Sequence, residues 1–176
     1  MEDRTKLFYE VYNRRRSVRD FTERSIEEEK LDRILETGRR AQSAANRQPW
    51  HFIVLRKGER EGLDELLHGD GFRRASVLIV TCADPEEAWI RNYDGKNYAD
   101  VDAAIALTEM IAAATAEDLG TCWVASVDPV KAKQILGISD RMELVGILVL
   151  GYPFEPLRYE EKDRKEMSQV VHWGRW

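Results

Sequence analysis

The sequence predicts an α+β fold in a single domain, residues 1–176, with helices on both sides of a central sheet. Its 176 residues, 43% of them hydrophobic and 34% charged, suit one globular domain with a sizeable core. No repeat, low-complexity tract or linker divides the chain. The expected order is two helices, strand, helix, strand, long helix, strand, helix and strand, which is typical of a sheet sandwiched between helices.

The first two elements are expected to be helices at residues 6–15 and 25–40. Ser25 is a candidate N-cap of the second helix, and Glu28, three residues later, would complete a capping box. Apolar residues recur at helical spacing in both segments, so each helix has one face for the core.

Two buried strands are expected at 51–55 and 76–83, because both are short, continuous apolar runs. An amphipathic helix at 58–69, ending at Gly69, would join them. The segment 84–97 is polar and aromatic, and it is expected to be a loop with a short helix at most.

Two later segments carry apolar surface that one chain does not readily bury. The helix expected at 98–119, which Gly120 would end, is ~30 Å long and apolar or small around most of its circumference. The tail, 154–176, is charged but holds aromatic anchors such as Trp173 and Trp176, and it cannot form a core of its own. The helix could be covered inside one subunit, although a partner subunit is the easier way, and the tail is expected to lie across another surface, such as that of a partner.

The remaining elements are expected to be a strand at 121–127, a helix at 128–138 and a strand at 143–153. The helix has clear start signals, with Asp128 as its N-cap and Pro129 at its first position.

Charge and composition exclude several classes of protein. The net charge of -5 and the pI of about 5.4 argue against nucleic acid as the main partner. The longest apolar run is shorter than the ~18 residues of a membrane span, and the N-terminus shows no signal peptide, so no membrane partner is expected. Cys82 and Cys122 lie far apart in apolar stretches and are expected to be free thiols, which indicates a reducing, cytoplasmic location. His51, His68 and His172 are scattered, so no metal site is expected.

Four arginines are concentrated between Arg14 and Arg19 in this acidic chain. Arg15, Arg16 and Arg19 flank Ser17 just past a helix, where guanidinium groups and a hydroxyl can hold a phosphate. The alternative is a basic helix C-terminus that complements the helix dipole. Taken alone, the segment favours this alternative.

Two further segments allow two interpretations each. Residues 42–52 include Asn46 and Gln48, whose amides could bind the polar edge of a heterocycle, or could cap nearby backbone while Trp50 packs in the core. Residues 118–126 could present backbone groups to a ligand, or could be an ordinary helix C-cap. The sequence has no G-x-G-x-x-G, Walker or G-x-S-x-G motif, so the usual dinucleotide, P-loop and serine-hydrolase interpretations lack support.

Taken together and in this order, these segments resemble the nitroreductase family of FMN-dependent oxidoreductases. The resemblance rests on RRSVRDF (15–21), SAANRQPWHF (43–52), DLGTCW (118–123), GYP (151–153) and KDRKEMSQVVHW (162–173). It covers nearly the whole chain. It implies an α+β sandwich with a mixed or antiparallel sheet, and an intertwined homodimer with an extended C-terminal tail and FMN at the interface.

The resemblance also implies which residues hold the cofactor. Arg15, Arg16 and Ser17 are expected to contact FMN, with Arg15 at the phosphate and Lys162 and Arg164 arriving there from the tail.

Other residues are expected at the flavin ring. By resemblance, Arg19 faces its pyrimidine edge, Asn46 contacts the ring edge, Ser43 contacts it from the other subunit, and the backbone of Gly120 and Thr121 lies near N5.

Three positions depart from the family pattern. Gln42 stands where the family often has Pro, Asp118 where its Gly-Leu-Gly turn begins with Gly, and Ala125 where it has Gly after the Trp, which affects the contact details and not the fold.

The activity that the resemblance implies is ping-pong hydride transfer from NADH or NADPH through flavin N5 to an electron-poor small molecule such as a nitroaromatic or a quinone. No side chain is expected to act as a catalytic acid or base, and Cys122 is expected to be a packed thiol. The alternatives are reductive dehalogenation, flavin breakdown, or an FMN-binding protein without enzymatic activity. The segment 84–97 is shorter than the lid that many members carry, so the acceptor stays open.

Overall fold

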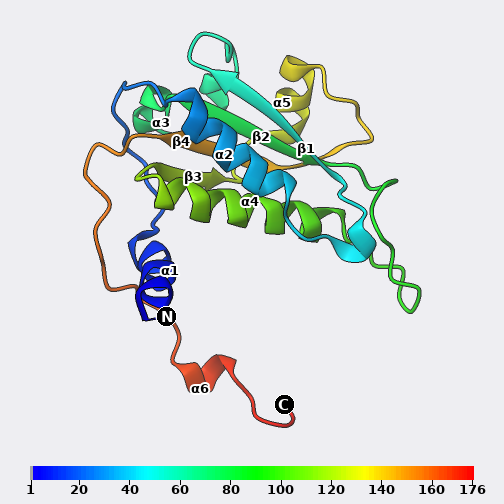
Figure 1. Ribbon diagram of the computed structural model, residues 1–176. Helices are drawn as coiled ribbons and strands as arrows, with labels where there is room; N and C mark the ends of the chain where they lie inside the picture. The colour runs from blue at the N-terminus through cyan, green and yellow to red at the C-terminus, as the bar shows by residue number, and fades with distance from the viewer. Residues whose placement is uncertain (1) are drawn as a thin grey trace.

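The computed structural model describes residues 2–176, which form a four-stranded antiparallel sheet with helices on both faces (Figure 1). The strands are β1 (Trp50–Arg56), β2 (Val77–Ala83), β3 (Gly120–Val124) and β4 (Glu143–Gly151), in the spatial order β1-β2-β4-β3. The helices are α1 (Glu2–Arg14), α2 (Glu28–Arg39), α3 (Asp70–Arg74), α4 (Ala99–Ala116), α5 (Pro129–Leu136) and α6 (Met167–Val170), with 3₁₀ turns η1 (Ala44–Asn46) and η2 (Asp64–Leu66). The predicted α+β class and antiparallel sheet are confirmed.

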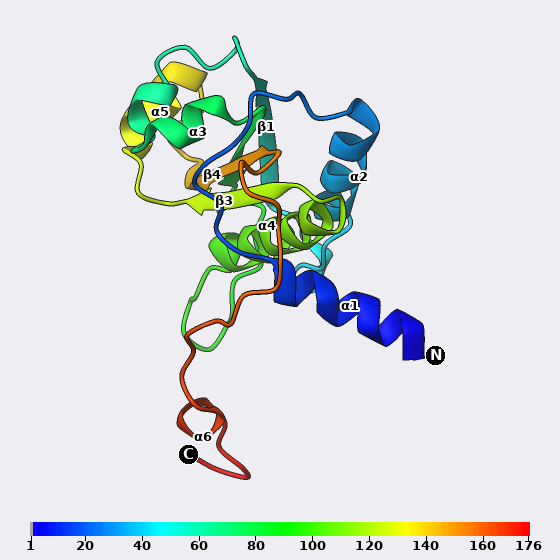
Figure 2. The same ribbon diagram turned by 90° about the vertical axis from the view of Figure 1, so that its left-hand side faces the viewer.

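Successive residues of β2 enter two different cores. Val77 and Ile79 pack with α2 and α4, whereas Leu78 and Val80 pack with residues of α3 and α5 on the other face. All of β2 is buried, because helices cover both faces of the sheet. Figure 2 shows the three layers, with α3 and α5 on one side of the sheet and α2 and α4 on the other.

Helix α4 buries only part of its apolar surface. Ala103, Ala106 and Met110 are fully buried, whereas Ala104 and Ile105 on its other face stay partly accessible. In the single chain, part of the apolar surface of α4 is therefore left uncovered.

The predicted capping box at the start of α2 is wrong. The helix begins at Glu28, its N-cap is Glu27, and that side chain makes no capping hydrogen bond. The carboxylate of Glu28 pairs instead with Arg56 at 2.6 Å, so a strand partner takes the group that the local pattern assigned to the cap.

The helix predicted at 58–69 is also wrong. Gly58 and Gly62 adopt φ angles of 100° and 77°, which break a helix, and only the short turn η2 forms between them and Gly69. The helix α3 begins after Gly69, whose φ is 132°.

Gly120 does not end α4, contrary to the prediction. The helix ends at Ala116, and Asp118 takes the left-handed position with a φ of 61°. Gly120 opens β3 instead, where a Cβ would lie 2.9 Å from Cγ2 of Val18. Its missing side chain therefore lets the segment after α1 lie against the sheet.

Several local predictions are confirmed. Asp128 caps α5 by accepting hydrogen bonds from the backbone N–H groups of Val130 and Lys131, and Pro129 is the first helical residue. The segment 84–97 contains no helix. Cys82 and Cys122 are free and buried.

The C-terminal tail leads away from the sandwich, and α6 is its one helix in the part of the chain that is described (Figures 1 and 2). Trp173 and Trp176 are 91% and 100% exposed. Between residues 2 and 176, no helix combines the length and the apolar character that crossing a membrane requires.

Candidate phosphate and cofactor site

A cavity of about 550 Å³ lies where the segment after α1 meets the tail after β4. Its lining residues come from the two ends of the chain: Arg15, Arg16, Ser17, Val18, Arg19, Asp20, Phe154, Glu155, Glu160, Lys162 and Arg164. Six of the residues predicted to hold the cofactor, Arg15, Arg16, Ser17, Arg19, Lys162 and Arg164, are therefore brought together.

The sheet holds the first of these segments in place. The backbone N–H of Val18 donates to the carbonyl of Thr121 at 2.8 Å, which joins the segment to β3. Phe21 is fully buried and pairs with Pro153 just beyond β4. The N–H of Phe154 donates to the carbonyl of Asp20 at 3.0 Å, so this segment also fixes where the tail begins.

Three cations of the cavity crowd one another. Burial first, and then the charges of Arg15 and Arg164, lower the pKa of Lys162 below its usual 10.5. The ammonium group of Lys162 donates to the backbone carbonyl of Tyr12. Among the side chains of residues 3–176, no carboxylate forms an ion pair with Arg15, Lys162 or Arg164. Within that part of the chain, these three side chains form a positive cluster that no carboxylate neutralises.

The acidic side chains at the rim are mostly neutralised by other partners. Glu160 forms an ion pair with Arg16, which also donates to the carbonyl of Glu155 at 3.3 Å. Asp20 pairs with Arg74 outside the cavity. The charge of Arg16 in the cavity is therefore already paired with a carboxylate, that of Glu160.

Arg19 lies on the β3 side of the cavity. It is exposed, and one of its guanidinium nitrogens lies 3.5 Å from the carbonyl of Ser17. Burial raises the pKa of the Cys122 thiol, and the nearby charge of Arg19 opposes that shift. Arg19 therefore sits close enough to β3 to affect a group on that strand.

The other predicted residues do not line this cavity. Gly120 and Thr121 are buried beneath it and support Ser17 and Val18. Ser43 and Asn46 lie in the loop at the opposite end of α4 (Figure 1). That helix has 18 residues and is about 27 Å long.

Sequence reasoning missed the acidic part of the cavity. Glu160 and Arg16 are 144 positions apart, so no local spacing points to their pairing. Phe154 and Glu155 directly follow the GYP segment, and that adjacency is the one signal that could have indicated them.

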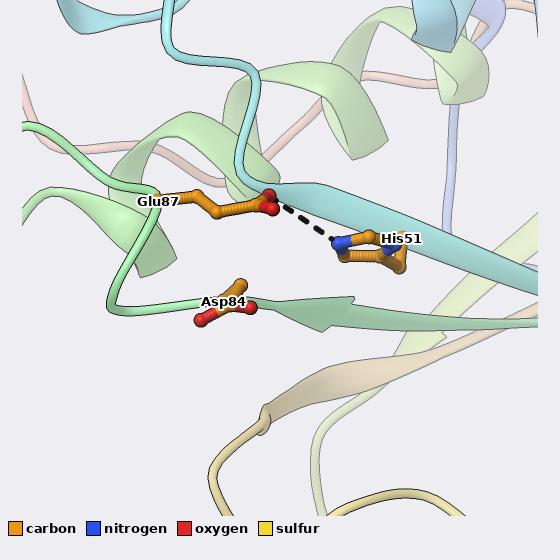
Figure 3. Close-up of side chains that lie close together, drawn as sticks. All are labelled: His51, Asp84 and Glu87. Atoms are coloured by element: carbon orange, nitrogen blue, oxygen red, sulfur yellow. Dashed lines mark ion pairs between the residues drawn. The ribbon is translucent and has the colours of Figure 1, made fainter.

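A second polar group, His51, Asp84 and Glu87, lies at the ends of β1 and β2 (Figure 3). Nε2 of His51 and Oε2 of Glu87 are 3.6 Å apart, and both side chains are about half exposed. Asp84 is buried, with Oδ1 accepting from the N–H of Glu86 at 3.0 Å and Oδ2 lying 2.7 Å from Nη2 of Arg141. A cation would have to compete with Arg141 for that carboxylate, so we interpret the group as an ion-pair cluster at the sheet end.

The fold and the clustered motifs define a class, and the chain belongs to the nitroreductase family. The sequence profile described as "Nitroreductase family" matches residues 12–71 and 63–152.

Individual proteins agree with this assignment. An Archaeoglobus fulgidus protein named "Putative NADH dehydrogenase/NAD(P)H nitroreductase" is 29% identical over 188 residues and covers 100% of both chains. A Bacillus subtilis protein named "FMN reductase [NAD(P)H]" is 29% identical over 174 residues, covering 89% of this chain and 69% of its own length. The crystal structure of a nitroreductase family protein from Clostridium difficile superposes with a TM-score of 0.84 at 30% identity, over 95% of this chain and 98% of the other.

Proposed function

We propose that this protein is an FMN-dependent oxidoreductase that takes electrons from NADH or NADPH and passes them to an electron-poor small molecule. Membership of the nitroreductase family and the similarity to an FMN reductase support the cofactor and the electron donor. The observation that carries the proposal is the positive cluster of Arg15, Lys162 and Arg164, which has no carboxylate partner among the side chains of residues 3–176.

The cluster suits the phosphate of FMN. A phosphate carries about two negative charges at neutral pH and three strong acceptor oxygens. Guanidinium groups such as those of Arg15 and Arg164 can donate paired hydrogen bonds to it, and Ser17 adds a hydroxyl. The anion would also relieve the repulsion that lowers the pKa of Lys162.

When bound, FMN would supply the redox chemistry for a ping-pong hydride transfer between the nicotinamide and the acceptor. Arg19 is proposed to lie at the pyrimidine edge of the ring. A fixed guanidinium there is worth ~4 kcal/mol toward an adjacent negative charge at an effective dielectric constant near 20, before desolvation costs. We assign no side chain as a catalytic acid or base, because solvent can supply the protons.

The proposed site needs a second copy of the chain. Ser43 and Asn46 lie at the far end of α4 from the positive cluster, so within one subunit they stay remote from a ligand held there. A homodimer that pairs the open faces of α4 would bring this loop of one subunit near the cavity of the other. It would also cover the exposed Trp173 and Trp176 of the tail.

The double variant Arg15→Ala with Arg164→Ala tests the cofactor assignment. We expect wild-type protein to be yellow and to bind FMN in a fluorescence titration, and the variant to lose most of that affinity. The matched control is Arg39→Ala with Arg73→Ala, which removes two arginines from exposed i,i+3 ion pairs whose side chains do not line the cavity. FMN binding that is equal in both double variants would place the phosphate elsewhere.

Anaerobic mixing with each nicotinamide tests the activity. Bleaching of the flavin by NADH or NADPH supports the oxidoreductase, whereas an FMN-binding protein without enzymatic activity would stay yellow. An acceptor panel of nitroaromatic, quinone and halogenated compounds then separates nitroreductase-like from dehalogenating chemistry.

A further inference from the structure

Asp102, in the first turns of α4, is a buried carboxylate attached to the loop that carries Ser43 and Asn46. Its side chain is 1% exposed, and Oδ1 accepts a hydrogen bond from the backbone N–H of Ala44 at 3.0 Å. Within residues 2–176, Oδ2 is buried and has no hydrogen-bond partner. The contact joins positions 58 residues apart, so it ties a helix to an otherwise irregular loop.

The backbone of this loop is strained, so contacts with the rest of the protein are needed to keep its conformation. Ala45, Asn46 and Gln48 have φ angles of 51°, 55° and 52°, in the left-handed region that side chains disfavour. Such residues are strained, and they persist only where the surroundings fix their conformation. Inside the loop, the N–H of Gln48 donates to Oγ of Ser43 at 3.0 Å. The link from Asp102 to Ala44 attaches this strained turn to the protein core.

A buried carboxylate is an expensive way to hold a loop. Asp102 lies among Ala99, Ala103 and Ala106, and burying a charge with one hydrogen bond costs more free energy than burying an apolar side chain there. The positive end of the α4 dipole offsets part of this cost. This free-energy cost of burying the carboxylate is understandable if the loop must keep one conformation.

We propose that Asp102 is a positioning residue, which holds the backbone of Ala44 and thereby fixes Ser43 and Asn46 in the conformation that meets the flavin of the other subunit. This inference rests on the proposed function. The hydrogen bond itself exists in the single chain, so its effect on the loop can be measured without the cofactor.

The first measurement is amide hydrogen exchange of residues 44–48 in FMN-free protein. Asp102→Ala should raise exchange at Ala44 at least tenfold, whereas Asp102→Asn, which keeps an acceptor oxygen, should stay near wild type. The matched control is Thr115→Val, which alters an equally buried polar side chain on α4 that donates within its own helix, to the carbonyl of Ile111. Unchanged exchange in Asp102→Ala would overturn the inference.

The second measurement is the dissociation constant of FMN. Asp102→Ala should weaken binding about tenfold, while Asp102→Asn and Thr115→Val should leave it unchanged. If Asp102→Ala does not fold, a folded Asp102→Asn that binds and exchanges like wild type supports the inference, and one that has lost the protection of Ala44 overturns it. Wild-type protein that does not bind FMN would refute the proposed function, and the exchange data would still decide whether Asp102 holds the loop. Wild-type protein that binds FMN, together with folded Asp102→Ala that binds equally well, would refute the positioning role alone.

Discussion

Gly71 packs directly against the backbone of Arg19. A Cβ at position 71 would overlap the carbonyl oxygen of Arg19 and lie 3.0 Å from its carbonyl carbon and 3.1 Å from Cα of Asp20. Gly71 belongs to α3, and its φ angle is not in the left-handed region, so the position requires glycine for space and not for conformation. Helix α3 therefore supports the backbone of the arginine segment at Arg19.

Gly71→Ala should displace Arg19 and weaken FMN binding about tenfold or more, because backbone atoms cannot move aside as a flexible side chain can. The control is Gly38→Ala, whose new methyl group would lie nearest to the flexible side chain of Met110. That change should cost roughly 1–3 kcal/mol of stability through overpacking and leave FMN affinity intact. A fluorescence titration and thermal unfolding of both variants give the two quantities. If Gly71→Ala had the FMN affinity and the stability of wild type, α3 would not be needed to support the backbone of Arg19.

Much of the fold could be predicted from local patterns. β2 is an unbroken apolar run because both faces of the sheet are covered, and the prediction at 76–83 is confirmed with a shift of one residue at its start. α5 could be placed because Asp128 and Pro129 act within a single turn. Such signals survive folding because the groups that they involve are neighbours in sequence.

Two other predictions failed for different reasons. The pattern at 58–69 suits an amphipathic helix, yet Gly58 and Gly62, which lack a side chain, take left-handed conformations there. Glu28 fits a capping box but pairs with Arg56 on β1, and local spacing does not indicate such a long-range pairing.

The candidate site shows the same division. The arginine segment and Lys162 were expected together because of the family resemblance, and both line the cavity. The hydrogen bond from Ala44 to Asp102 could not be predicted from the sequence, because acidic residues are common in the first turns of helices.

FMN affinity should depend on pH through Lys162. Its pKa lies below 10.5 because of burial and because of Arg15 and Arg164, so its charge is lost at a lower pH than that of an isolated lysine. Arginines stay charged and the phosphate stays dianionic above about pH 7. FMN affinity should therefore fall as pH rises through the lowered pKa of Lys162. In FMN-free protein the free energy of unfolding should rise over the same window, because the folded state releases this proton before the unfolded chain does.

Titrations of FMN over a pH series test this dependence. Lys162→Met should bind more weakly at neutral pH and lose the decline, and riboflavin, which lacks the phosphate, should show no decline with wild-type protein. The expectation fails if wild type and Lys162→Met share one pH profile for FMN.

Cys82 should be unreactive in the native protein. Burial raises the pKa of its thiol from 9.0 to about 11, against a smaller opposing effect of Lys133. The thiolate fraction near pH 8 is then roughly 100-fold lower than for an unperturbed thiol, and the thiol is 1% exposed. Iodoacetamide labelling followed by mass spectrometry should modify Cys82 in denatured protein and leave it unmodified under native conditions. Equal labelling rates in the native and denatured protein would show that the fold does not protect the thiol of Cys82.

The open face of α4 should be a subunit interface. A mostly apolar hollow along its accessible side is lined by Val101, Ala104, Ile105, Thr108 and Glu109. Ile105→Arg places a charge there, and burying that charge without a partner would cost several kcal/mol in a dimer. In a monomer the guanidinium can reach solvent, and the cost is limited to the partial packing of Ile105 against the core. We expect light scattering to give twice the chain mass for wild type and one chain mass for this variant. FMN binding by Ile105→Arg should weaken because the dimer is lost, and the loop with Ser43 and Asn46 would no longer reach the cavity of the other subunit.

The control is Val130→Arg on the exposed surface of α5, on the opposite side of the sheet, which should stay dimeric and bind FMN as wild type does. A dimeric Ile105→Arg that keeps its affinity for FMN would show that the second subunit is joined through another surface.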